Sequence, residues 1–411
     1  MIDVSTQTAG YSAIRVGTSA HAGRMTRRTD HERYAVAIGQ CVDNLAEDWN
    51  GRSRQAAATA FQTGRWLDAW YGTIGRAIGE PFLIRMVDRR SGALAAMLPL
   101  VRRTEGPFRI VEFADNGVSD YNAPVLGPAA PRDMAGATLL WSALRGALAD
   151  ADLVRFKKMP AEIEGRINPL VLLPASGRSA AHSNVVAIEA GWDAYRYTLK
   201  RKFRKELGRA WRVFSKHEGA AFRRIEGPEE AARVLAALEH QQATRIRELG
   251  LPYRLGRPEI AAFYRTLTRE GIADRSVILT ALTRRDEVIG ALLGIARGQT
   301  FVMIRISSAS GWSTSSPGRL IISQTMQMLH GEGYRYFDFS IGDYVYKDRF
   351  GPQPRPLYNL SEALSPRGWP LVVCDRTRTF AARQPMLNAL ARRFTNRAGR
   401  ATEVSAEPET D

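Results

Sequence analysis

The sequence is poor in cysteine, with Cys41 and Cys374 as its two copies among 411 residues. A disulfide scaffold and a cysteine-rich metal site are therefore excluded. The six histidines show no metal-ligand spacing either, so we expect no bound metal. A glycine-rich nucleotide loop of the P-loop or dinucleotide type is also missing.

Long hydrophobic runs are missing as well. No window approaches the ~18 apolar residues that a membrane span requires. The first residues, MIDVSTQTAG, lack the basic start and apolar stretch of a secretory signal. We therefore expect a cytoplasmic protein without a transmembrane segment.

Positive charge is in excess, with 58 Lys and Arg against 42 Asp and Glu, a net charge of +16. The segment from Arg196 to Lys216 holds nine of these cations against Glu206 alone. It is predicted to form an amphipathic helix whose apolar stripe packs on a domain. Its basic face could meet an anionic glycan, a lipid-linked precursor, a membrane surface or tRNA, and a plain solvated face is favoured over any single partner.

The length and the 45% hydrophobic content predict two domains, each with its own core. Residues 1–30 and 398–411 are polar and aperiodic, which is typical of disordered tails. Between them the chain has the same order of elements twice. In the first half we expect a helix, three strands, a polar loop, a helix and a strand: Arg65–Ile78, Phe82–Asp88, Ala93–Val101, Arg109–Phe113, Met134–Asp150 and Leu153–Lys157.

The second half repeats this order with clearer helix signals. Proline and acidic residues open its helices and glycine follows them. The expected elements are Glu229–Leu249, Pro258–Glu270, Ser276–Thr283, Val288–Ala296, Thr300–Ser307, Arg319–His330 and Tyr334–Ser340, with further strands at Leu357–Ala363 and Pro370–Cys374. A repeat of element order without a repeat of letters indicates two related α/β domains.

The loop SSASGWSTSSPG, residues 307–318, leads into the helix that begins at Arg319. Proline suits a first helical turn, and glycine lets a ligand approach the backbone. Free N–H groups and the positive end of the helix dipole favour an anion there. A simple capped helix start would have the same sequence.

The stretch GYRYFDFSIGDYVYKDRFG, residues 333–351, gathers tyrosines, carboxylates and cations in a short span. A carboxylate between aromatic residues in a strand needs either a partner or a polar cleft. Asp338 or Asp343 could simply pair with Lys347 or Arg349. Beside a candidate anion site, the cluster favours a functional role.

These residues carry a resemblance. The element order over residues 219–340 resembles the GNAT acyltransferase fold, and SPGRLI together with GYRYFDFSIGDYVYKDRFG resembles the CelD/BcsL-like branch, also described as BioF2-like acetyltransferase domains. FQTGRWLDAWYGTIG and LPLVRR resemble the same group, so the match covers residues 45–375. The usual pyrophosphate signature, Arg/Gln-x-x-Gly-x-Gly/Ala, is absent, and Ser315-Ser316-Pro317-Gly318-Arg319 stands in its place.

The resemblance implies an α/β fold of tandem GNAT-like domains, each a mixed twisted sheet flanked by helices. The implied domains are a disordered tail (1–30), a degenerate N-terminal GNAT-like domain (31–180), a basic linking helix (181–218), a C-terminal GNAT acyltransferase domain (219–378) and a basic, then acidic tail (379–411).

The resemblance also implies acetyl-CoA or another acyl-CoA as cosubstrate, with direct transfer to an amine or hydroxyl of a small molecule or glycan. The residues implied to bind the cofactor are Ile304, Arg305, Ile306, Ser316, Pro317, Gly318, Arg319, Leu320, Lys347 and Arg349. Asp338 or Asp343 is the expected base, and Tyr346 or Tyr344 the expected acid.

Members of this group are associated with cellulose or exopolysaccharide biosynthesis. Two alternatives stay open at this point. One is a Fem-like transferase that uses aminoacyl-tRNA, and the other is a non-catalytic tandem-GNAT module that binds a glycan or a synthase. Coenzyme binding separates the first function from both alternatives.

Overall fold

The computed structural model describes residues 33–39, 56–189, 191–342 and 344–383. The predicted N-terminal tail, Cys41, Asp343 and residues 384–411 lie outside these ranges. No helix within them is long and apolar enough to cross a membrane.

The N-terminal half has the predicted order of elements. Its first helical segment runs through α2 (Gly64–Trp70), a π turn (Tyr71–Gly75) and α3 (Arg76–Ile78). The strands follow the alternation of the sequence, since every second residue of β2 is buried. The remaining elements are β1 (Tyr34–Gly39), β2 (Glu80–Asp88), β3 (Leu94–Glu105), β4 (Phe108–Phe113), β5 (Val125–Leu126), α4 (Met134–Ala147), β6 (Leu153–Pro160), β7 (Glu162–Ile163) and β8 (Arg166–Ile167).

The C-terminal half also follows the prediction. Proline opens α7, α8 and α9, where its missing N–H costs no helical hydrogen bond. The elements are β10 (Ala220–Ile225), α7 (Pro228–Glu248), α8 (Pro258–Gly271), β11 (Val277–Arg284), β12 (Glu287–Arg297), β13 (Thr300–Ser308), α9 (Pro317–Gly331), β14 (Tyr336–Ile341) and the short α10 (Val345–Asp348).

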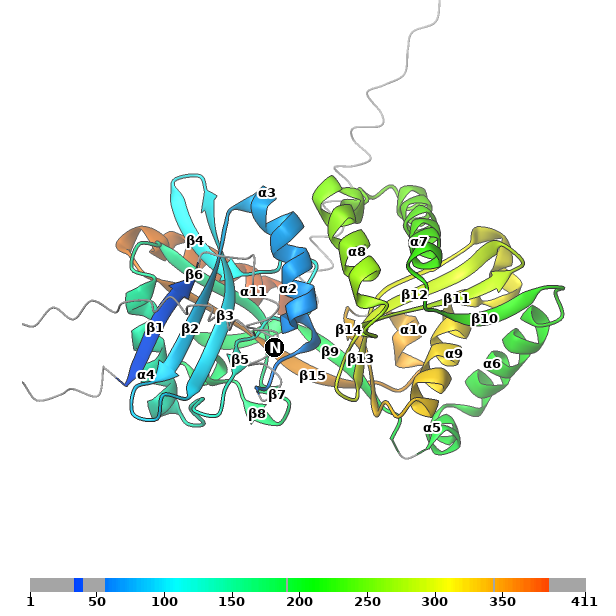
Figure 1. The fold of residues 1–411 in the computed structure, drawn as a ribbon, viewed down its shortest axis with the longest axis horizontal. Helices are drawn as coiled ribbons and strands as arrows, with labels where there is room; N and C mark the ends of the chain where they lie inside the picture. Colours follow the sequence, from blue (N-terminus) through cyan, green and yellow to red (C-terminus); the bar gives the residue numbers. More distant parts are fainter. Residues whose placement is uncertain (1–32, 40–55, 190, 343, 384–411) are drawn as a thin grey trace, which may run out of the picture.

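The same topology occurs in both halves. In each, three antiparallel strands are followed by a helix and a strand parallel to the third: β2–β3–β4 with α4 and β6, and β11–β12–β13 with α9 and β14. Figure 1 shows the two halves side by side. The repeated element order of the sequence is therefore a repeated fold.

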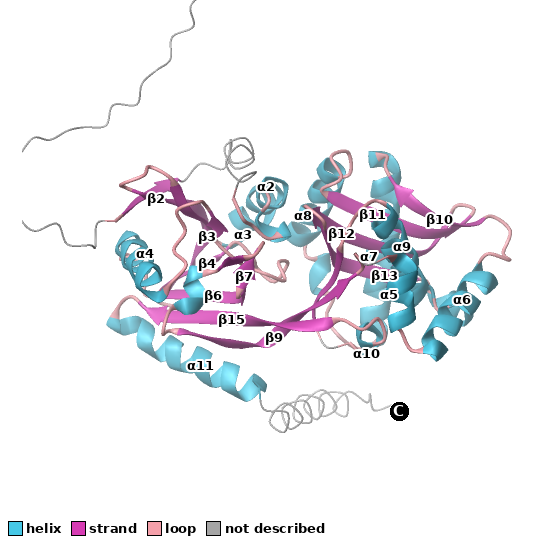
Figure 2. Cartoon of the chain, turned by 90° about the horizontal axis from the view of Figure 1, so that it is seen from below, coloured by secondary structure: helices cyan, strands magenta, loops and turns pink. Residues whose placement is uncertain are grey.

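The halves exchange their last strands. β9 (Ser176–Ala187) follows the first half in sequence but pairs with β14 of the second. β15 (Gln353–Ala363) follows the second half but pairs with β6 of the first, and β9 and β15 also pair with each other. One 13-stranded mixed sheet results, and both strands run between the halves (Figure 2).

Two local predictions are wrong. Residues 181–218 do not form one linking helix: they comprise the end of β9, α5 (Trp192–Thr198), α6 (Arg201–Phe214) and the turn to β10. Pro370–Cys374 is not a strand but part of α11 (Trp369–Arg383), which packs along β15 and β9. β15 and the first ten residues of α11 fall inside the predicted second domain, 219–378. They nevertheless contact the first half, because β15 pairs with β6 and α11 packs along β15 and β9.

Helices cover both faces of the sheet. α2 and α8 pack together across the two halves, with the Trp66 and Phe263 rings 4.8 Å apart in an edge-to-face contact. Their core continues over β11–β13, so one apolar cluster includes residues of both halves. α9, α5 and α6 cover the opposite face, against Phe337 and Phe339. The two faces of β14 therefore have different surroundings.

Gly294 on β12 allows the closest approach within this sheet. A Cβ atom there would lie 2.1 Å from the Phe301 ring and 2.6 Å from the Val302 carbonyl oxygen. We expect Gly294→Ala to lower the free energy of unfolding by about 1–3 kcal/mol, measured by urea denaturation. Gly177→Ala on β9, where the added Cβ meets nothing within 4 Å, is the matched control. Equal stability of the two variants would contradict the packing.

Candidate functional site

The start of α9 borders a cavity of about 820 Å³, here called the α9 cavity. Its walls come from α7, the loop after α7, the end of β13, the first turn of α9 and the segment around α10. Seven residues predicted from the sequence line it: Ile306, Ser316, Pro317, Gly318, Arg319, Tyr344 and Tyr346.

The loop before α9 is shaped for a close approach to the backbone. Ser316 caps the helix in a left-handed conformation (φ 45°, ψ 55°), and Pro317 follows in the first turn. A Cβ on Gly318 would meet nothing within 4 Å, so the space beside it is open. The N–H groups of a first helical turn lack intrahelical acceptors, and the dipole is positive there. This end of the cavity suits an anion.

β13 and β14 separate beside the cavity. They pair in parallel through three residue pairs, the last of which is Val302 with Asp338. Ser340 then takes a positive φ of 65°, and beyond Asp338 β14 keeps only its pairing with β9 on the other edge. On the side of the gap the rest of β13 has no strand partner within the described chain, although its Ile306 carbonyl accepts a hydrogen bond from Gln242. An extended chain could add to that edge.

The two tyrosines near α10 lie at the cavity with different exposure. Their rings stack with centroids 5.9 Å apart; Tyr344 is 59% exposed and Tyr346 is half-buried. Burial raises the pKa of Tyr346 to about 12. Its hydroxyl therefore keeps its proton at neutral pH and can donate it.

The predicted phosphate-binding arginines share one carboxylate. Glu206 of α6 accepts hydrogen bonds from Arg319 at 3.1 Å and from Arg349 at 2.5 Å. Arg319 also donates to the Ser316 hydroxyl at 2.7 Å, while Arg349 lies over the Phe203 ring. The hydrogen bond from Arg349 lowers the pKa of Glu206. Arg319 lines the α9 cavity, whereas Arg349 lies outside the cavity wall and is connected to Arg319 through Glu206.

Four other residues that were predicted to bind the cofactor lie outside the α9 cavity. Lys347 is buried and donates to the Ile341 carbonyl at 2.6 Å, so it holds the turn after β14. Leu320 is a core residue of α9, and Ile304 packs on the core under α7 and α8. The Arg305 side chain is 1% exposed beneath the cavity floor.

The buried Arg305 organises side chains that the sequence analysis missed. It donates to Gln242 at 2.6 Å and to the Tyr253 hydroxyl at 2.7 Å, and lies 3.5 Å from Glu239. Gln242 donates in turn to the Ile306 carbonyl, and Gln241 accepts from Ser307. These amides hold α7 against β13, and nothing in the sequence distinguishes them from surface glutamines of a helix.

Asp338 lies apart from the α9 cavity. Its carboxylate is 4% exposed and accepts from the Tyr121 hydroxyl at 2.7 Å and from the Ser340 N–H at 2.7 Å. Burial raises the pKa of Asp338 to about 6, and the neighbouring Asp120 adds to the increase. Asp120 itself accepts from the Ser340 hydroxyl, and burial raises its pKa.

Tyr121 and Asp120 come from the N-terminal half, in the polar loop DNGVSDYNAP. That loop was visible in the sequence, but its contact with β14 spans more than 200 residues and was not. The N-terminal half thus supplies side chains at the point where β13 and β14 part.

Asp338 and Tyr121 face a second cavity, of about 690 Å³, here called the inter-half cavity. Its walls are the β7–β8 hairpin, the β12–β13 turn, the first residues of β13 and β14, and parts of β9 and β15. Arg297 of the turn binds Glu164 of the hairpin at 2.8 Å and the carbonyls of Ala56 and Ala58. This ion pair joins the two halves at the edge of the cavity.

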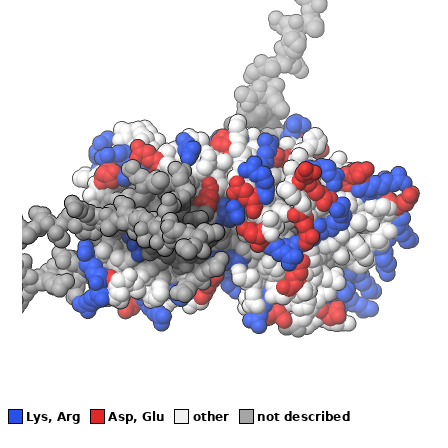
Figure 3. Space-filling model, viewed as in Figure 1, with Lys and Arg blue, Asp and Glu red and all other residues white. Residues whose placement is uncertain are grey.

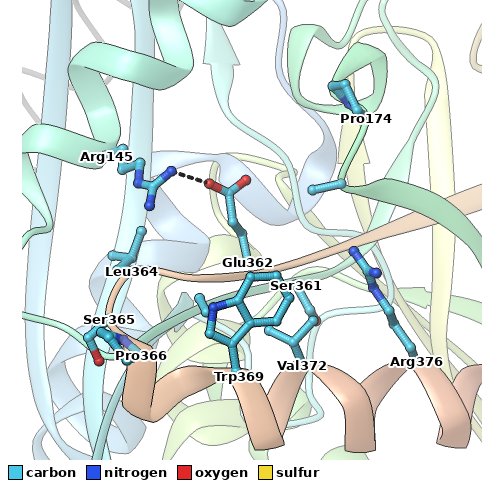
Figure 4. A pocket seen from close by; sticks show the side chains of 12 residues that line it. Arg145, Pro174, Ser361, Glu362, Leu364, Ser365, Pro366, Trp369, Val372 and Arg376 are labelled. Carbon is cyan, nitrogen blue, oxygen red and sulfur yellow. Dashed lines mark hydrogen bonds and ion pairs between the residues drawn. The ribbon is translucent and has the colours of Figure 1, made fainter.

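A third cavity, of about 460 Å³, lies between α11 and β15. Figure 4 shows Arg145 and Glu362 paired across it, with Trp369 and Val372 of α11 on its other side. None of the predicted site residues lines this cavity.

The basic segment forms an exposed surface on α5 and α6. Phe203, Ala210 and Phe214 are buried against α9, while most of the cations face solvent. In Figure 3 blue side chains gather at the end of the molecule that carries α6. Among the residues whose placement is described, no group of three or more His, Cys, Asp or Glu could hold a metal ion.

Comparisons with known proteins identify the segment that carries the α9 cavity. Residues 201–348 match the family model described as an acetyltransferase (GNAT) domain. No curated protein matches the chain by sequence.

Three solved structures resemble most of the chain at low sequence identity. FemX has a TM-score of 0.54 at 11% identity over 76% of this chain and 95% of its own. A tandem GNAT protein from the clavulanic acid biosynthesis pathway has a TM-score of 0.45 at 11% identity (81% and 99% covered), and L-PGS from Bacillus licheniformis one of 0.45 at 13% (76% and 94%). Residues 201–348 thus match an acetyltransferase (GNAT) domain, and the overall fold of the chain is like that of FemX.

Proposed function

We propose that the protein is an acyl-CoA-dependent acyltransferase that transfers an acyl group directly to an amine or hydroxyl acceptor. One observation carries the proposal: beyond Val302 the edge of β13 has no partner in β14, and the end of β13, Ile306–Ser308, lines the 820 Å³ cavity at the start of α9. A long ligand with an anionic end and an amide-bearing arm fits this arrangement.

The donor would bind with its pyrophosphate on the backbone of residues 317–320. Arg319 is the nearest cation, and Arg349 is connected to it through Glu206. The pantetheine arm would lie in the gap and pair with the free edge of β13. From Ile306 to Val302 is four residues, about 13 Å of extended strand, so the arm would carry the thioester toward Asp338.

The chemistry would follow from position. The acceptor attacks the thioester carbonyl, the new bond forms, and the C–S bond breaks. Alignment of the two reactants supplies about 7–11 kcal/mol of the barrier reduction. A backbone N–H of residues 304–306 would stabilise the oxyanion, worth on the order of 10²–10³ in rate.

Proton transfer would involve one residue on each side of the thioester. Asp338 is the proposed base, because a carboxylate with a pKa of about 6 is ionised at neutral pH and can still accept a proton. Tyr346 is the proposed acid for the leaving thiolate. A sugar or polysaccharide precursor is the first acceptor class to screen.

The donor site can be tested by calorimetric titration with CoA and acetyl-CoA. We expect micromolar binding to the full chain, and a loss of at least tenfold in Gly318→Trp, whose indole would fill the open space beside the helix start. Gly331→Trp, at the far end of α9 and equally open, is the matched control and should bind normally.

Absence of binding to either ligand would contradict the acyl-CoA donor. A Fem-like donor would then be tested by titration with aminoacyl-tRNA, whose affinity should fall steeply with salt.

The buried Asp338 predicts a dependence of stability on pH. Its pKa is about 6 in the folded chain and about 3.8 when exposed, so the folded state binds more protons between these values. The free energy of unfolding of the wild type should therefore rise by about 1.4 kcal/mol from pH 8 to pH 5 through this group.

Asp338→Asn should lack that increase, measured by urea denaturation at the two pH values. Asp193→Asn, at an exposed carboxylate, is the control and should follow the wild type. An identical pH dependence in Asp338→Asn would show that Asp338 is not a buried titrating group.

A further inference from the structure

Among the described residues, the buried carboxylate of Asp338 in the inter-half cavity has no cationic hydrogen-bond partner. The hydrogen-bond donors to Asp338 are the Tyr121 hydroxyl and the Ser340 N–H, which are both neutral. Burial raises the pKa of Asp120, which is the neighbour of Asp338, and the positive charges of Lys158 and Lys347 act to lower it. An ionised carboxylate in a buried place is costly unless a positive group compensates it. The cavity on which Asp338 opens has room for that group.

The same cavity has a cation without an anionic partner. Arg355 on β15 lines it and is exposed, and no ion pair or hydrogen bond of its side chain occurs within the described part of the chain. Its charge reaches Asp338 only through space, where it lowers the pKa.

The other charges on the walls are mostly compensated. Arg297 is held by Glu164 and by two backbone carbonyls. Glu162 is exposed on the β7–β8 hairpin. Among the described residues, the uncompensated charges on the walls are thus the interior carboxylate of Asp338 and, at the exposed rim, the Arg355 guanidinium and the Glu162 carboxylate.

We propose that the inter-half cavity binds a small molecule with a primary ammonium group and a separate anionic group. The ammonium would lie at Asp338 and the phosphate or carboxylate at Arg355. Val185, Val302 and Leu357 would enclose the carbon skeleton between them. As the acceptor of the acyl group, which rests on the proposed function, this molecule would present its amine where β13 and β14 part.

The volume of the inter-half cavity agrees with a ligand of this class. A volume of 690 Å³ holds a molecule of the size of a sugar phosphate or an amino acid derivative, and small-molecule sites range from about 300 to 1,000 Å³. The walls come from both halves, so neither half alone would form the site.

Three matched probes separate the two charges: glucosamine 6-phosphate has both groups, glucose 6-phosphate lacks the amine, and glucosamine lacks the phosphate. Titrated into the full chain without donor, glucosamine 6-phosphate should bind at least tenfold more tightly than either of the others.

Variants then assign each charge to its residue. Asp338→Asn should remove the preference for glucosamine 6-phosphate over glucose 6-phosphate, and Arg355→Gln should remove the preference over glucosamine. Arg285→Gln, on the β11–β12 turn outside the cavity, is the control for Arg355. Gly318→Trp should leave all three affinities unchanged, which excludes phosphate binding at α9.

Absence of saturable binding of all three probes would overturn the proposal, as would an amine preference that persists in Asp338→Asn. Arg355 is exposed, so its variant is expected to fold even where Asp338→Asn does not. Coenzyme binding without probe binding would overturn this inference alone, whereas probe binding without coenzyme binding would overturn only the donor assignment.

Discussion

The pairing of β14 with two different strands is the constraint on which the site depends. β14 binds β13 on one edge as far as Asp338 and β9 on the other, and beyond Asp338 it follows β9. β9 belongs in sequence to the first half. Since β14 stays paired with this exchanged strand after its pairing with β13 has ended, β14 is held away from β13. The gap, the free edge of β13 and the opening toward the start of α9 all follow from that backbone pairing. The strand exchange is therefore part of the site as well as of the fold.

The electrostatics of the two cavities complement this geometry. At the α9 cavity a helix start and Arg319 favour an anion, and Glu206 holds both arginines in position. At the inter-half cavity the carboxylate of Asp338 gives the inner wall a negative charge that no described cation balances through a hydrogen bond. An anionic donor and a cationic amine would therefore be drawn to different places, with the gap between β13 and β14 in between. Through the contact of Tyr121 with Asp338, the N-terminal half would take part in the proposed chemistry.

Much of the fold was predictable because its signals are local. Apolar segments bounded by turn signals indicated β2, β11 and β12, and proline, acidic and glycine signals bounded α7, α8 and α9. The strand predicted at Pro370–Cys374 is wrong because a short apolar run does not distinguish a strand from one side of a helix. The helix predicted over residues 181–187 is wrong. The charge run after Arg196 indicates an amphipathic helix for the segment, whereas β9 is defined by its pairing with β14 and β15.

Local sequence patterns predicted the repeated α/β architecture, the helix start at residues 316–319 as a candidate anion site and the aromatic and acidic cluster of residues 333–351, because each depends on neighbouring residues. Tertiary structure decided which of these residues work together. It placed Tyr344 and Tyr346 with the α9 loop, buried Lys347 and Arg305 in supporting roles, and moved Asp338 to a second cavity beside Tyr121. Those outcomes depend on contacts between residues as many as 217 positions apart, and such contacts are fixed by strand pairing rather than by local pattern.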